Sequence, residues 1–99
     1  MERIPKINPV YPPYLYLAQV AEHCPKAIST YLALWRTANK ECKVRVYKDE
    51  VRTEFLISLS KFRHDLLLLV KEALVSVEET KKVINIELVG WDEDGDLCA

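Results

Sequence analysis

The pattern of apolar and polar positions along the chain predicts a run of helices followed by a pair of strands. The clearest helix is predicted over residues 59–73, where apolar residues recur at three- and four-residue steps and so share one face. The residues on that face are Phe62, Leu66, Leu69, Val70 and Ala73. Ser58 precedes the helix and suits an N-cap, because its hydroxyl accepts from an otherwise unpaired backbone N–H. We expect the apolar face to be buried.

Three shorter helices are predicted ahead of this one, over residues 14–23, from Pro25 to residue 40, and over residues 48–56. Proline suits a first helical position, where its missing N–H needs no partner. The spacing in the second helix leaves polar residues for solvent: Lys26, Ser29, Thr30, Arg36 and Thr37. In the third, acids in the first turn favour the positive end of the helix dipole. Its buried side is expected to hold Val51, Phe55 and Leu56.

Strands are predicted where the pattern changes to strict alternation. Residues 43–46 alternate charged and β-branched side chains, which is typical of a short strand with one wet face. Residues 74–78 and 83–88 alternate in the same way, and the polar stretch 79–82 connects them. We expect these two segments to form a β-hairpin, with no specific turn motif to fix the loop length.

Composition and length indicate one soluble domain. The chain has 99 residues, of which 49% are hydrophobic and 29% charged. No apolar run approaches the roughly 20 residues that span a membrane, and the amino terminus lacks the apolar core of a secretory signal, so the expected location is the cytoplasm. The three cysteines, Cys24, Cys42 and Cys98, are far apart and form no metal-binding or redox motif. We expect them to be unreactive thiols.

Charge is spread unevenly, although the net charge is only −1. Residues 25–75 hold ten Lys or Arg against six Asp or Glu, whereas residues 76–99 hold two Lys against seven acids. The middle of the chain is therefore the part suited to phosphate, and the acidic end is not.

The order of these elements resembles that of a winged helix-turn-helix domain. The segment from Ile57 through Leu66 to Leu74, with its Ile-Ser turn before a helix, is similar to the recognition-helix region of bacterial and phage winged-helix regulators and replication initiators. The likeness implies an α+β fold with a three-helix core and a small antiparallel sheet that includes the wing. The division it implies is an N-terminal proline-rich arm and short helix (1–24), a winged-helix domain (25–89) and an acidic tail (90–99).

In that family the exposed side of the helix enters the DNA major groove and the wing reaches the neighbouring backbone. The resemblance therefore implies a small DNA-binding protein, a transcriptional regulator or accessory factor that acts as a dimer on double-stranded DNA. The DNA-binding candidates are Ser60, Lys61, Arg63, His64, Lys81 and Lys82. The alternative for these residues is a solvated helix face without a ligand.

Several positions depart from the family pattern. Leu67 and Leu68 fall on the polar side of the helix, where a DNA reader usually shows polar or basic groups. They either complete the core or form a dimer or partner interface together with Tyr14 and Tyr16. The competing hypothesis is thus a winged-helix protein-interaction module that does not bind DNA. Ala73 replaces the usual glycine, which predicts a turn without positive φ.

Acidic residues at the wing are a further departure. The wing begins with Glu78 and Glu79 and is followed by Asp92, Glu93 and Asp94, and these acids would repel a phosphate backbone that lay near them.

Catalysis is not expected. The chain contains no glycine-rich phosphate loop, no HExxH and no GxSxG, and its two glycines give little scope for a ligand loop. His23 and Cys24 are adjacent in the sequence, and neighbours on a helix point about 100° apart, so they do not pair as a nucleophile and its base. We therefore predict neither an enzyme activity, nor a metal, nor a cofactor.

Overall fold

Four α-helices and a three-stranded antiparallel sheet make up residues 12–90, the part of the chain that the computed structural model describes. The elements are α1 Tyr14–His23, η1 Pro25–Ala27, α2 Ile28–Thr37, β1 Lys43–Tyr47, η2 Lys48–Glu50, α3 Val51–Phe55, α4 Leu59–Lys71, β2 Val75–Glu79 and β3 Val83–Leu88, where η marks a 3₁₀ turn. The predicted α+β class is confirmed, and every predicted helix and strand lies close to its expected position.

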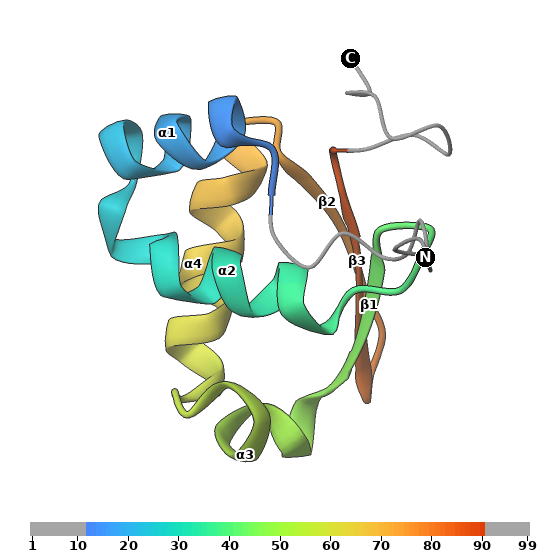
Figure 1. The fold of residues 1–99 in the computed structure, drawn as a ribbon. Coiled ribbons are helices and arrows are strands. Elements are labelled where there is room, and N and C mark those ends of the chain that lie inside the picture. The colour runs from blue at the N-terminus through green and yellow to red at the C-terminus, as the bar shows by residue number, and fades with distance from the viewer. Residues whose placement is uncertain (1–11, 91–99) are drawn as a thin grey trace, which may run out of the picture.

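The sheet has the strand order β1-β3-β2, so the last strand lies between the other two. Lys43 pairs with Glu87 at one end of β1, and Tyr47 pairs with Val83 at the other. The β2–β3 hairpin is closed by Thr80, whose backbone N–H donates to the carbonyl of Val83 over 2.8 Å. The helices lie on one side of the sheet (Figure 1). The tip of the hairpin, residues 80–82, therefore stands at the end of the sheet where β1 finishes.

The core lies between the helices and the covered face of the sheet. Its apolar side chains come from every helix and strand of the described chain, and they include Val20, Tyr31, Leu34, Trp35, Val46, Val51, Phe62, Leu69, Ile84 and Ile86. Removal of this apolar surface from water is the main force that holds the elements together. Val20 shows that α1 belongs to the same core as α4.

Helix α4 begins as predicted and ends two residues early. Ser58 is its N-cap, with its hydroxyl accepting from the backbone N–H of Lys61 over 3.1 Å. Beyond Lys71 the chain turns at Ala73, where φ is 62°. The backbone N–H groups of Ala73 and Leu74 then donate to the carbonyls of Val70 and Leu69, which is the Schellman arrangement of a helix end.

Two predictions about α4 were therefore wrong. Ala73 does adopt positive φ, because the helix must stop abruptly for the chain to enter β2. Val70 and Ala73 do not belong to the buried face: Val70 is 40% exposed, and Ala73 lies outside the helix and is exposed. Phe62, Leu66 and Leu69 are buried as expected.

The segment 48–56 is a 3₁₀ turn followed by one short α-helix. Val51 is buried, but Leu56 is 82% exposed, so its predicted burial was wrong. The reason is the backbone: Leu56 ends α3 with φ at 61°, and this left-handed conformation turns the side chain away from the helix face that Val51 buries.

The two ends of the described chain meet at Trp35. A Cβ atom added to Gly90 would lie 2.3 Å from a ring carbon of Trp35 and 3.6 Å from a ring carbon of Pro13. Trp35 is completely buried, so only glycine fits at position 90 without displacing its ring.

Candidate nucleic-acid interface

One side of α4 faces away from the core. We call the exposed side chains on this side the outer face of α4; they are Ser60, Arg63, His64, Leu67, Val70 and Lys71. The outer face lies beside the hairpin, because Arg63 on α4 donates a hydrogen bond of 2.5 Å to the carboxylate of Glu79 at the end of β2. The elements that the sequence assigns to groove and wing are thus in direct contact.

Arg63 shares its acceptor with a second cation. Lys48 forms an ion pair with the same oxygen of Glu79 over 2.7 Å, so one carboxylate joins α4, η2 and β2. The hydrogen bonds from Lys48 and then Arg63 hold the pKa of Glu79 below its usual value, since both stabilise the charged form. Glu79 is therefore a carboxylate at neutral pH and offsets one of the two positive charges.

The side chain of Lys61 is half-exposed, but its ammonium is bound within the fold. Its ammonium donates to both carboxylate oxygens of Asp65, over 2.7 and 2.8 Å, and to the carbonyl of Lys26 over 3.2 Å. Asp65 is completely buried. A buried carboxylate requires such a partner, so Lys61 has a structural role that competes with any contact to a ligand.

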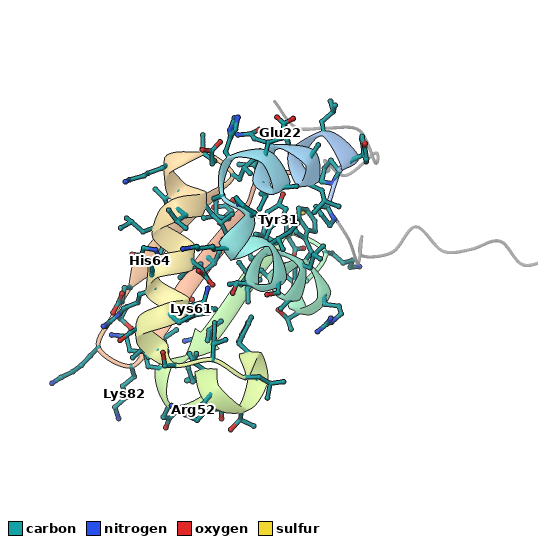
Figure 2. The ribbon with its side chains drawn as sticks, turned by 90° about the vertical axis from the view of Figure 1, so that its left-hand side faces the viewer. Glu22, Tyr31, Arg52, Lys61, His64 and Lys82 are labelled. Carbon is teal, nitrogen blue, oxygen red and sulfur yellow. The ribbon has the colours of Figure 1, made fainter. Side chains whose placement is uncertain are left out.

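The hairpin tip carries Lys81 and Lys82, both exposed, and neither side chain forms an ion pair among residues 12–90. The carbonyl of Lys82 accepts a hydrogen bond of 2.9 Å from the backbone N–H of Lys48, which fixes the base of the tip to η2. In Figure 2, Lys82 and Arg52 of α3 lie at the same end of the molecule. This end presents the ammonium groups of the hairpin tip and the guanidinium of Arg52 to solvent, and the exposed acids of η2 and α3 lie on the same elements as Arg52: Asp49, Glu50 and Glu54.

Ser60 and His64 complete the polar candidates on α4. Both are exposed, and within the described part of the chain neither side chain has a hydrogen-bond partner. Figure 2 shows His64 on the side of α4 that faces away from α2. Their polar atoms are therefore available to an external ligand.

The four apolar interface candidates divide into two kinds. Leu67 is 54% exposed and Tyr14 is exposed on α1, whereas Leu68 and Tyr16 are partly buried and pack against the core. Leu68 thus contributes to core packing, which is one of the two alternatives that the sequence leaves open. Leu67 remains available for a partner.

At the far end of α4, Glu72 is held by α1. Its carboxylate accepts hydrogen bonds of 2.8 Å from both Gln19 and His23, and its carbonyl accepts from Gln19 over 3.1 Å. The carboxylate raises the pKa of His23, because it stabilises the imidazolium, and His23 and Gln19 in turn lower the pKa of Glu72. This cluster fixes α1 to the end of α4.

Metal-ligating side chains, membrane-spanning helices and thiols are the other features to consider within residues 12–90. No group of three or more His, Cys, Asp or Glu is placed to hold a metal ion, and no helix is long and apolar enough to cross a membrane. Cys24 and Cys42 are buried, and burial raises the pKa of the Cys24 thiol, which lowers its reactivity. Cys98 lies outside the described residues.

Comparison with known proteins finds no family model that matches the chain, and no significant match among curated proteins or solved structures.

The sequence predicts Glu79 as an acid at the start of the wing and Lys48 as a helix start, but their spacing along the chain gives no sign that they meet. Their contact at this candidate interface was therefore missed. Asp65 did carry a signal, because it stands three residues after Phe62 and four before Leu69, within the apolar face of α4. An acid in that position, four residues after Lys61, indicates a buried ion pair.

Proposed function

We propose that this protein is a small winged helix-turn-helix DNA-binding protein, which acts as a transcriptional regulator or accessory DNA-binding factor. The element order, the strand order β1-β3-β2 and the basic positions support this proposal. The observation that carries it is the contact between Arg63 of α4 and Glu79 of the hairpin, since it brings the outer face of α4 and the hairpin tip to one side of the molecule.

In the proposed complex α4 lies in the major groove and the hairpin tip follows the neighbouring backbone. Ser60 and His64 then reach base edges, because they are exposed and have no partner among residues 12–90. Lys81 and Lys82 meet phosphates and contribute affinity without sequence preference. Arg63 contacts either a base or a phosphate. A single module of this size makes few contacts, so we propose that a dimer binds two half-sites.

The test is binding of a fluorescent DNA duplex, followed by anisotropy over a range of salt concentrations. We expect the double change Lys81→Ala with Lys82→Ala to weaken binding on the order of tenfold and to reduce the salt slope by about two, because each lost phosphate contact lowers that slope by ~0.9. Lys61→Ala is unsuited to this test, because it leaves Asp65 without its ammonium partner.

The matched control is Lys40→Ala with Lys43→Ala. It removes the same charge from exposed positions at the opposite end of the sheet, where Lys43 pairs with Glu87. Equal loss of affinity in the two double variants, or salt-independent binding by the wild type, overturns the proposed interface.

The second candidate function is a protein-interaction module with the same fold. It is favoured by Leu67 and Val70, which are 54% and 40% exposed and lie about one turn apart on the outer face of α4. A partner or a second copy that covers them removes apolar surface from water. Under this hypothesis Leu67→Asp abolishes association in sedimentation experiments, and changes at Lys81 and Lys82 have no effect.

A further inference from the structure

Glu79 occupies a position that suits a phosphate. Its carboxylate oxygen accepts from the guanidinium of Arg63 over 2.5 Å and from the ammonium of Lys48 over 2.7 Å. A guanidinium and an ammonium that converge on one anionic oxygen are the donors that proteins use for phosphate groups. The three groups come from α4, η2 and β2, so the site is fixed by the fold and not by one mobile loop.

The site is also accessible. The side chain of Glu79 is 34% exposed and that of Arg63 is 49% exposed, whereas Lys48 is mostly covered, at 19%. Ion pairs that reach solvent contribute little net stability, so an external anion can replace the carboxylate at small cost to the fold. The backbone of Lys48 stays in position when this happens, because its N–H donates to the carbonyl of Lys82 over 2.9 Å.

We propose that Glu79 is an internal substitute for a DNA phosphate. In the free protein it neutralises part of the charge of Arg63 and Lys48, and in the complex a backbone phosphate takes its place between them. This inference rests on the proposed DNA-binding function and adds Glu79 as a residue that lowers the affinity for DNA. Glu79 lowers affinity for any duplex, so that binding depends more on the contacts that Ser60 and His64 make to bases.

Glu78 provides a matched control. It is the preceding residue on β2, carries the same charge and is exposed, but alternation along the strand directs it to the opposite face of the sheet. Its strand partner is Asn85, and within the described residues it forms no ion pair. Glu78→Gln therefore changes the net charge as Glu79→Gln does, without releasing Arg63 or Lys48.

The experiment compares the wild type, Glu79→Gln, Glu78→Gln and Lys81→Ala with Lys82→Ala on one DNA duplex of arbitrary sequence, by anisotropy over a range of salt. We expect Glu79→Gln to bind about three- to tenfold more tightly and its salt slope to increase by about one, as one further phosphate contact predicts. Glu78→Gln should give a clearly smaller gain. In a background that carries both Arg63→Gln and Lys48→Gln, the effect of Glu79→Gln should fall to that of Glu78→Gln, because neither cation is then left to be released.

The two proposals fail in different ways. If the wild type binds DNA through Lys81 and Lys82, but Glu79→Gln binds no more tightly than Glu78→Gln, the proposed function stands and the role of Glu79 is overturned. Weaker binding by Glu79→Gln also overturns it, since Glu79 then positions Arg63 for its contact. If neither the wild type nor Glu79→Gln binds the duplex, both proposals are overturned. Circular dichroism of each variant confirms that the fold is retained.

Discussion

The hydroxyl of Thr30 on α2 donates a hydrogen bond of 2.6 Å to the carboxylate of Asp65 on α4, and both residues are buried. Asp65 also accepts from the ammonium of Lys61. Its negative charge is therefore paired with Lys61, which reaches solvent, and hydrogen-bonded to Thr30 in the core. The sequence pattern assigned Thr30 to solvent, which was wrong, because Thr30 faces the one polar group within the apolar face of α4. This contact fixes how α2 packs on α4.

Replacement of Thr30 by valine should destabilise the protein by about 1–3 kcal/mol, because valine keeps the shape of threonine but removes the hydroxyl donor to the buried carboxylate, which then keeps only the ammonium of Lys61 as a side-chain donor. Urea unfolding monitored by circular dichroism measures the change. Ser29→Ala is the control, since Ser29 is the exposed neighbour on the same helix and should change stability by less than about 0.5 kcal/mol. A Thr30→Val protein as stable as the wild type would show that the hydrogen bond contributes nothing.

Ala73→Gly should stabilise the protein. Ala73 has φ at 62°, where its Cβ atom crowds the backbone and glycine has no such penalty. We expect a gain of about 0.5–1 kcal/mol in the free energy of unfolding, after the greater freedom of glycine in the unfolded chain is taken into account. Thermal unfolding measures it. Ala33→Gly within α2 is the control and should have the opposite sign, because glycine in a helix interior is unfavourable.

The contact between α1 and α4 should depend on pH through His23 and Glu72. The raised pKa of His23 means that its contribution is fully present below the ordinary histidine value of 6.5, and is lost as pH rises through the raised value. The lowered pKa of Glu72 means that its contribution is present above the ordinary value of 4.5, and is lost as pH falls through the lowered value. The contact is therefore strongest between these two limits.

Nuclear magnetic resonance of the histidine ring protons tests this pH dependence. We expect His23 to titrate above its ordinary value in the wild type and to return toward that value in Glu72→Gln, which keeps the side-chain shape but removes the charge. His64→Gln removes the only other histidine signal and so assigns the remaining one to His23. An unchanged His23 titration in Glu72→Gln would mean that the carboxylate is not the cause.

Much of the fold could be predicted from the sequence, because the apolar spacing reports which face of each element is buried. Phe62, Leu66 and Leu69 repeat at helical steps and are buried, and Ser58 caps the helix that they define. The failures occur where the backbone leaves its regular conformation. Leu56 and Ala73 both adopt positive φ, and neither residue type indicates this, since glycine is the usual choice at such positions.

The contacts of the candidate interface were predicted less completely, because they join residues far apart in the sequence. The local pattern predicts which polar side chains are exposed, but it does not predict which of them form ion pairs within the fold. The exposed candidates are Ser60, Arg63, His64, Lys81 and Lys82. Arg63 meets Glu79 sixteen positions later, and Thr30 meets Asp65 thirty-five positions later. Only the three-dimensional packing of α2, α4 and the hairpin decides which cations are already paired.

Leu67 and Leu68 are adjacent in the sequence but should respond differently to the same substitution. Leu68 packs against the core, so Leu68→Asp places a carboxylate in an apolar environment and should cost more than about 2 kcal/mol of stability. Leu67 is 54% exposed, so Leu67→Asp should change stability by less than about 0.5 kcal/mol. Urea unfolding of the two variants measures the difference directly.

Because Leu67→Asp is expected to leave the fold intact, any loss of self-association or partner binding in this variant is attributable to the outer face of α4. Equal destabilisation by the two changes would show that Leu67 is covered in solution, as a dimer through this face requires, and the effect would then increase with protein concentration.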